Sequence, residues 1–176
     1  NRESCVAIDV AHPASQLCIA LACALLGCRW VRGSIEALAS KAVGVTHHIY
    51  SGKVRLPGAY LSCPVDQTWL PNGRFSERYQ FEGFASSSAI WMIVQSSGTT
   101  GTPKFIAISA DAMPLRAEAR PYDYLAGNMP VVTSLIHHLF TFGLEYALKA
   151  LVLGGTIVVA RDLAYLANNG VTTVVG

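Results

Sequence analysis

Short runs of apolar residues alternate with polar, glycine and proline positions along the first third of the chain. Runs with strand-like or helix-like composition predict strands at residues 5–10, 29–32 and 45–50, and helices at residues 12–26 and 34–42. His12-Pro13 is typical of a helix start, Gly27 of a helix end and Ser34 of an N-cap. Strands that alternate with helices predict an α/β fold, in which helices cover both faces of a parallel sheet.

The remaining chain combines an irregular stretch with a second series of predicted elements. Proline and glycine interrupt the apolar runs between residues 51 and 88, which predicts irregular connections with short strands. The later pattern predicts strands at residues 89–95, 105–108, 129–136, 156–160 and 171–175, and helices at residues 109–119, 144–153 and 162–168. Ser109 is the expected N-cap of the first of these helices, and Gly154-Gly155 is the expected end of the second.

Composition supports a folded interior and excludes several classes of partner. Of the 176 residues, 52% are hydrophobic and 14% are charged, which is enough apolar material for a sizeable core. The formal net charge of +2 comes from scattered residues, so no nucleic-acid partner is expected. The longest apolar segment, residues 17–26, has about half the length that crosses a bilayer, so no membrane partner is expected either.

Cysteine usage indicates the redox environment. The five cysteines show no Cys-x-x-Cys spacing: Cys5, Cys18, Cys23, Cys28 and Cys63. Their odd number and apolar surroundings predict buried thiols rather than disulfides or metal ligands. Because the N-terminal residues also lack the pattern of an export segment, a reducing, cytoplasmic location is expected.

The stretch from Ser96 to Lys104 has the most distinctive chemistry in the chain. The candidate phosphate-binding residues are five residues with a hydroxyl group, two glycines and one lysine: Ser96, Ser97, Gly98, Thr99, Thr100, Gly101, Thr102 and Lys104. Glycine lets the main chain approach a ligand closely, and hydroxyl and N–H groups bind anionic oxygen. The P-loop of nucleoside triphosphatases requires Gly-Lys-Ser/Thr followed by a helix, whereas here Pro103 precedes the lysine and a predicted strand follows. The sequence therefore predicts a phosphate-binding loop at the tip of a hairpin.

The run Ser96-Ser97-Gly98-Thr99-Thr100-Gly101-Thr102-Pro103-Lys104 resembles the Ser/Thr/Gly-rich loop of the adenylate-forming superfamily. This superfamily includes acyl- and aryl-CoA synthetases, luciferases and the adenylation domains of peptide synthetases. Its members usually have a glycine after the lysine, where this chain has Phe105. The resemblance implies that residues 1–176 form a partial N-terminal adenylating domain, the N-terminal portion of the large domain. Its first α/β half would span about residues 1–88, and its second half, which carries the loop, about residues 89–176.

A second segment looks like the part of these enzymes that lines the acyl or aryl pocket. The run Leu139-Phe140-Thr141-Phe142-Gly143-Leu144 is similar to the Leu-Phe-Phe-Ala-Tyr-Gly-Leu run of benzoate-type aryl-CoA ligases. The resemblance implies a pocket for aromatic or compact acyl groups, formed by His138, Phe140, Thr141, Phe142 and Gly143. The two phenylalanines are alternatively core residues. No metal site is assigned, because adjacent histidines on a strand face opposite ways and no cluster of other ligands completes a site.

The resemblance implies an ATP-dependent acid–thiol ligase. In such an enzyme a carboxylate attacks the α-phosphate of ATP, and a thiol then displaces AMP from the acyl-adenylate. The implied partners are a small-molecule carboxylic acid, ATP, Mg²⁺, and CoA or a carrier-protein thiol, and the loop would hold the β- and γ-phosphates. The family's catalytic lysine belongs to a small C-terminal domain without a counterpart here, so no catalytic residue is assigned. The isolated chain is expected to be an inactive fragment, whose apolar surface the rest of the enzyme or a homodimer partner covers.

Other functions remain open from the sequence. A peptide-synthetase-type adenylation domain would share the loop and differ in its acceptor, a carrier protein in place of CoA. A non-catalytic nucleotide-binding remnant would keep the loop alone, and a polar surface hairpin would bind nothing. The resemblance at Phe140 and Phe142 favours the CoA ligase.

Overall fold

The computed structural model describes residues 3–39, 43–52, 55–57, 61–65, 81, 83–96, 104–112, 115, 130–134, 141–159 and 162–175. The chain forms two compact units, Asn1–Ala110 and Asp111–Gly176. The sequence analysis predicted a boundary between two α/β halves near residue 88. Strand Ile90–Gln95 nevertheless belongs to the first unit, because it pairs with strand Arg29–Arg32.

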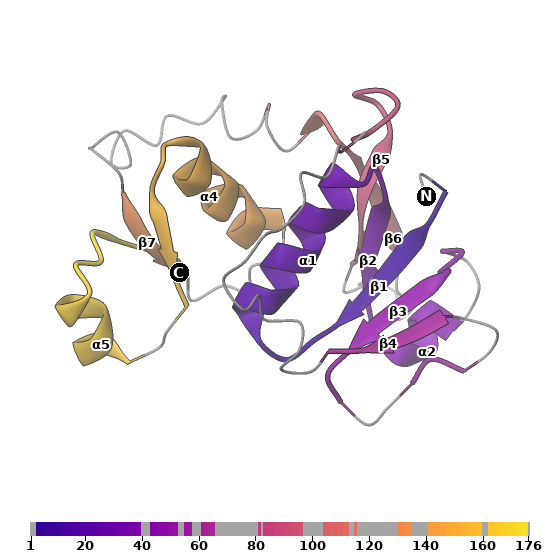
Figure 1. Ribbon diagram of the computed structural model, residues 1–176, viewed down its shortest axis with the longest axis horizontal. Coiled ribbons are helices and arrows are strands. Elements are labelled where there is room, and N and C mark those ends of the chain that lie inside the picture. The colour runs from indigo at the N-terminus through magenta and orange to yellow at the C-terminus, as the bar shows by residue number, and fades with distance from the viewer. Residues whose placement is uncertain are drawn as a thin grey trace. The chain divides into compact units, whose positions relative to one another are not determined.

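The first unit contains a six-stranded sheet with two helices. Its elements are β1 (Cys5–Asp9), α1 (Pro13–Leu25), β2 (Arg29–Arg32), α2 (Ile35–Ala39), β3 (His47–Tyr50), β4 (Leu61–Pro64), β5 (Ile90–Gln95) and β6 (Phe105–Ser109). The strand order is β4-β3-β1-β2-β5-β6, and neighbours are parallel except for the antiparallel pair β5 and β6 (Figure 1). The predicted alternation of strands and helices around a parallel sheet is confirmed.

Helix α1 begins and ends where the sequence predicted. Pro13 occupies the first helical position, where its missing N–H group has no partner to lose. Gly27 adopts a left-handed φ of 66°, and the following N–H of Cys28 donates to the carbonyl of Cys23 at 2.8 Å. Among the described helices, none combines the length and apolar character that a membrane crossing requires.

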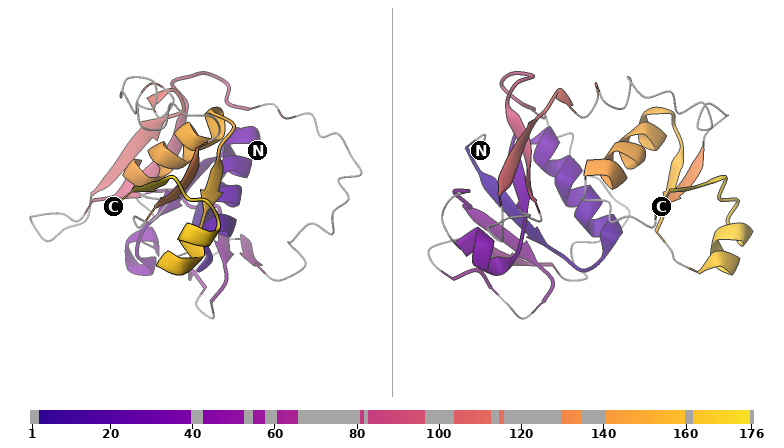
Figure 2. Two further views of the ribbon diagram at one scale, coloured as in Figure 1. Left: turned by 90° about the vertical axis from the view of Figure 1, so that its left-hand side faces the viewer. Right: turned by 180° about the vertical axis from the view of Figure 1, so that it is seen from behind.

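The two faces of the six-stranded sheet pack against different helices (Figures 1 and 2). One face forms a buried cluster with α2, made of Cys5, Ala7, Val31, Leu38, Val43, Val45, Leu56 and Ile93. Trp30 and Met92 alternate with the strand residues of this cluster and are fully buried, which places them on the face of α1. The indole N–H of Trp91 also donates to the carbonyl of Ala20 in α1 at 3.2 Å. Both faces are therefore covered, as the pattern predicted.

The second unit has a smaller parallel sheet. Its elements are β7 (Val131–Ser134), α4 (Thr141–Val152), β8 (Thr156–Val158), α5 (Leu163–Asn168) and β9 (Thr173–Val175), with the strand order β8-β7-β9. Val132, Tyr146 and Ala150 form its buried cluster. Asp162 caps α5, because its carboxylate accepts hydrogen bonds from two main-chain N–H groups of the first turn.

Two expectations from the sequence were wrong. Ser109 is not an N-cap, because it is the last residue of β6 and pairs with Ile90. The helical hydrogen bonding begins two residues later, where the carbonyl of Asp111 accepts from the N–H of Leu115. The rest of the helix predicted up to residue 119 lies outside the described residues.

The five cysteines form no disulfide, but only Cys5, Cys23 and Cys28 are buried, whereas Cys18 and Cys63 are exposed. Burial, assisted by the neighbouring thiols, raises the pKa of Cys23 to about 12, so this thiol is a poor nucleophile.

A buried histidine makes the stability of the first unit depend on pH. His48 is fully buried, stacks on Tyr50, and accepts a hydrogen bond at Nδ1 from the N–H of Leu56. Burial lowers the pKa of His48, and the carboxylate of Asp9, whose Oδ2 lies 3.9 Å from Nε2, only partly offsets this effect. The unfolded chain therefore binds a proton at a higher pH than the folded chain does, and the folded state loses stability as the pH falls through this interval.

We expect the free energy of unfolding to decrease as the pH falls below about 6.5, the ordinary pKa of histidine. His48→Asn keeps an acceptor near the position of Nδ1 and should remove this part of the pH dependence. Urea denaturation at pH 7.5 and pH 5.5 measures the difference. His47→Asn, at the neighbouring half-buried position, is the matched control and should keep the decrease. An equal decrease in the parent and in His48→Asn would contradict this interpretation.

Candidate functional site: the base of a phosphate loop

The carboxyl ends of five parallel strands lie at one edge of the six-stranded sheet. The last residues of these strands are Asp9, Arg32, Tyr50, Pro64 and Gln95. Parallel α/β sheets bind their ligands outside the carboxyl ends of the strands. The predicted phosphate loop begins directly after Gln95 and so starts at this edge.

The two ends of the predicted loop are held together by the β5–β6 hairpin (Figure 1). Gln95 pairs with Phe105 in the antiparallel register, and the N–H of Ser96 donates to the carbonyl of Lys104 at 2.8 Å. The predicted hairpin is thereby confirmed, with Ser96 and Lys104 at its base. The Lys104 residue is exposed. The intervening predicted site residues, Ser97, Gly98, Thr99, Thr100, Gly101 and Thr102, lie outside the described residues.

Two polar residues near this base were not among the predicted site residues. The side-chain carbonyl of Gln95 accepts a hydrogen bond from the N–H of Ser34, the residue that precedes α2, at 2.8 Å. Arg32 pairs with Val94 in the neighbouring strand and is half-buried. Burial lowers the pKa of Arg32, and the charge of Asp9 partly opposes this effect. The available signal in the sequence was that a polar residue ends each of these two strands, Arg32 in β2 and Gln95 in β5.

The predicted acyl or aryl pocket falls in the second unit. His138 and Phe140 lie outside the described residues, whereas Thr141, Phe142 and Gly143 form the start of α4. The sequence predicted that this helix begins at Leu144, and the predicted start is therefore three residues later than the observed one. Gly143 is buried and helical although glycine is a poor helix former, because packing of the apolar face of α4 outweighs local propensity. The described side chains after Gly143 that are fully buried include Leu144 and Glu145.

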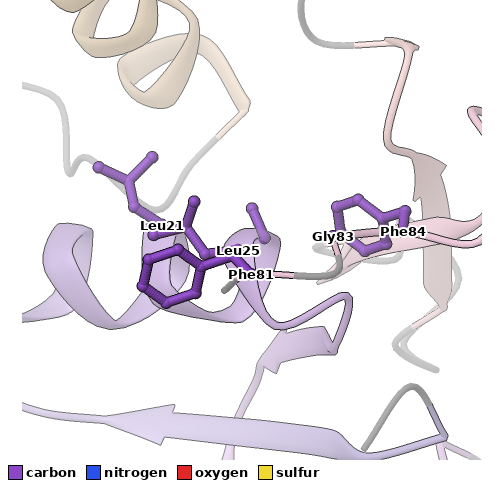
Figure 3. A pocket seen from close by; sticks show the side chains of 6 residues that line it. Leu21, Leu25, Phe81, Gly83 and Phe84 are labelled. Carbon is purple, nitrogen blue, oxygen red and sulfur yellow. The ribbon is translucent and has the colours of Figure 1, made fainter. Parts of the chain in front are cut away.

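No other feature of the described residues offers a comparable site. They contain no group of three or more histidine, cysteine or carboxylate side chains that could hold a metal ion. A cavity of about 530 Å³ lies between α1 and the segment that contains Phe81, and its lining residues are apolar: Leu21, Ala24, Leu25, Phe81, Gly83 and Phe84 (Figure 3). Because no lining side chain is polar, the cavity has no side chain that could bind a charged substrate or support acid–base chemistry.

The fold is similar to that of many solved protein chains. o-Succinylbenzoate-CoA synthetase (MenE) from Bacillus subtilis, in complex with the acyl-adenylate intermediate OSB-AMP, matches with a TM-score of 0.79 and 18% identity, over 97% of this chain and 48% of that chain. The N-terminal subdomain of Klebsiella oxytoca NpsA, in complex with 3-hydroxybenzoyl-AMSN, has a TM-score of 0.71 and 20% identity, over 98% and 46% of the two chains. A malonyl-CoA ligase with bound methylmalonyl-CoA and AMP has a TM-score of 0.71 and 22% identity, over 96% and 38%.

A further structure of MenE, in complex with ATP and a magnesium ion, matches with a TM-score of 0.79 and 15% identity, over 97% of this chain and 49% of that chain. By sequence, no model of a known protein family matches, and no curated protein matches. The chain thus spans about half the length of the MenE chain. At these identities the likeness shows the fold alone, and the predicted α/β class is confirmed: the chain has the mostly parallel α/β fold found in these adenylate-forming enzymes.

Proposed function

We propose that the chain is the N-terminal part of an ATP-dependent acid–thiol ligase, which activates a carboxylate as an acyl-adenylate and transfers the acyl group to CoA. The observation that carries this proposal is the Ser/Thr/Gly-rich run between Ser96 and Lys104, which connects the paired strands β5 and β6 of this fold in sequence. Neither feature suffices alone, because short polar hairpins are common and folds host many functions.

The loop is suited to hold the β- and γ-phosphates of ATP. Its hydroxyl and N–H groups supply donors, and Lys104 supplies a positive charge that is exposed at the end of the loop. When the substrate carboxylate attacks the α-phosphorus, the bond to the bridging oxygen breaks and pyrophosphate leaves with the electron pair. Donors fixed around the β- and γ-phosphates orient this leaving group and offset its charge.

Mg²⁺ fits this site chiefly through the phosphates themselves. Magnesium usually keeps several waters and binds substrate phosphates together with one or two carboxylates. The described residues contain no cluster of three ligand side chains, so they provide no all-protein magnesium site. When bound with ATP, the ion would neutralise phosphate charge and support the role of the loop.

The acyl group is proposed to be aromatic or compact. This proposal rests on the likeness of residues 139–144 to benzoate-type ligases, with Thr141, Phe142 and Gly143 at the start of α4 and His138 and Phe140 before it. Two of the similar structures hold ligands with an aromatic acyl group, OSB-AMP and 3-hydroxybenzoyl-AMSN, and the malonyl-CoA ligase holds a short aliphatic one. Benzoate-type and short aliphatic acids are therefore the substrates to test first.

The test has two parts. The intact mass of the natural protein is compared with the 18.8 kDa of this chain, and ATP–pyrophosphate exchange is then measured with benzoate-type and short aliphatic acids. We expect a larger mass and exchange that depends on the added acid, followed by acyl-CoA formation when CoA is supplied. A larger protein without acid-dependent exchange would contradict adenylation, and exchange without CoA acylation would point to a carrier-protein acceptor.

A further inference from the structure

A side chain at the base of the phosphate loop contacts a distant part of the first unit. Gln95 is the last residue of β5, and its Oε1 accepts the N–H of Ser34 at 2.8 Å across 61 positions of sequence. Ser34 lies between β2 and α2, and its own hydroxyl and carbonyl accept from the N–H groups of Ala37 and Leu38. The contact therefore joins the start of the loop to a capped helix end.

Gly33 provides the space that this contact requires. A Cβ atom at residue 33 would lie 2.7 Å from Oε1 of Gln95 and 3.3 Å from the ring of Phe105. Real Cβ atoms do not approach other atoms to 2.7 Å, so any larger residue at position 33 must displace the Gln95 side chain. Phe105, which pairs with Gln95 and follows Lys104, packs against the buried cluster around α2. Gln95 thus contacts the residue before α2, and Phe105 packs against the buried cluster to which Leu38 of α2 belongs.

We infer that Gln95 is a positioning residue for polyphosphate binding, with Gly33 as the residue that makes room for it. This inference rests on the proposed function of the loop. A loop that binds phosphate with main-chain N–H groups must present them in a fixed direction, and misplacement by a fraction of an ångström weakens such contacts. The Ser96–Lys104 hydrogen bond fixes the width of the loop base, and the Gln95–Ser34 hydrogen bond fixes the start of the loop against the sheet edge.

The test is isothermal titration of the intact protein with inorganic tripolyphosphate, and separately with ATP, in the presence of Mg²⁺. Gln95→Met keeps the length of the side chain and removes the acceptor. Because a net hydrogen bond of this kind corresponds to a roughly 2- to 10-fold change in an equilibrium constant, we expect Kd for tripolyphosphate to rise by that factor. The Ser34 amide should also exchange its proton faster in the variant.

Ser51→Ala is the matched control. Its hydroxyl accepts the N–H of Ala11 at 2.8 Å, a hydrogen bond of the same kind at the carboxyl ends of β1 and β3. We expect Ser51→Ala to lower the free energy of unfolding by a similar amount and to leave tripolyphosphate binding unchanged. Gly33→Ala should weaken binding as Gln95→Met does, and the double variant should bind about as well as the weaker single variant, because both substitutions remove one contact.

The outcomes separate the two proposals. If the intact parent protein binds tripolyphosphate and its Gln95→Met variant binds it equally well, the positioning role is wrong and the phosphate loop stands. An equal loss of binding in Ser51→Ala would also overturn the positioning role, since the effect would then follow general stability. If the intact parent protein binds neither tripolyphosphate nor ATP, the proposed function fails, and the inference fails with it.

Discussion

Replacing Lys104 with alanine is expected to slow acid-dependent ATP–pyrophosphate exchange of the intact enzyme by about 100-fold, the usual cost of removing one group that stabilises transition-state charge. The fold should survive, because Lys104 is exposed and its contact with Ser96 uses the main-chain carbonyl, which alanine retains. The loss is therefore expected in the chemical step rather than in the unfolding temperature. Rapid-quench measurement of pyrophosphate release, beside thermal unfolding, separates the two.

Lys149→Ala provides the control for this prediction. Lys149 lies in the last turn of α4, outside the loop, so its removal changes the net charge equally without touching the phosphates. Lys104→Arg keeps the positive charge and should retain more activity than the alanine variant. Unchanged pyrophosphate release in Lys104→Ala would remove the main argument for a phosphate loop.

Replacing Gly155 with alanine is expected to destabilise the second unit by about 3 kcal/mol, at the upper end of ordinary overpacking costs. The added Cβ would lie 2.3 Å from the carbonyl oxygen of Pro130 and 2.9 Å from that of Ala150. Both oxygens are fixed, because they accept hydrogen bonds of 2.8 Å from Thr156 and from Gly155 itself. The turn between α4 and β8 must then open, which pulls the helix away from the strand.

Gly154→Ala is the control at the adjacent position. Gly154 has a left-handed φ of 71°, but no atom lies within 4 Å of its added Cβ. Its expected cost is therefore only the backbone strain, about 1–2 kcal/mol. Amide exchange of Thr156 under native conditions reports the opening of this unit. Equal protection of the Thr156 amide in the two variants would show that the carbonyl of Pro130 can move aside despite its hydrogen bond, and would contradict the expected difference.

Local sequence signals predicted the elements of the fold well. The composition of Cys5–Val10, the Pro13 start and the Gly27 end of α1, and the apolar strands around the loop each depend on residues within a few positions. Ser109 was misassigned for a related reason, since a serine after an apolar run is an equally good strand end and helix cap. Only pairing with Ile90 distinguishes the two.

Features that depend on distant residues could not be predicted from the sequence. The strand order and the hydrogen bond between Gln95 and Ser34 join segments that are far apart along the chain. Helix α4 begins at Thr141 rather than at the predicted Leu144. Its buried face, which includes Leu144 and Ala150, packs against β7 and β8, and the local sequence does not reveal this packing. The predicted loop and pocket residues were identified by resemblance, and only the base of the loop and the start of α4 lie in the part of the chain that the structure describes.

The hairpin that closes the loop also has a consequence for the order in which the first unit folds. Strands β5 and β6 pair through a short connection, whereas β5 reaches β2 only after a long segment has been brought back. Hairpins form within about 1–10 μs, and long-range parallel pairing is slower because its loop-closure entropy is larger. The two ends of the phosphate loop are therefore expected to meet before β5 pairs with β2.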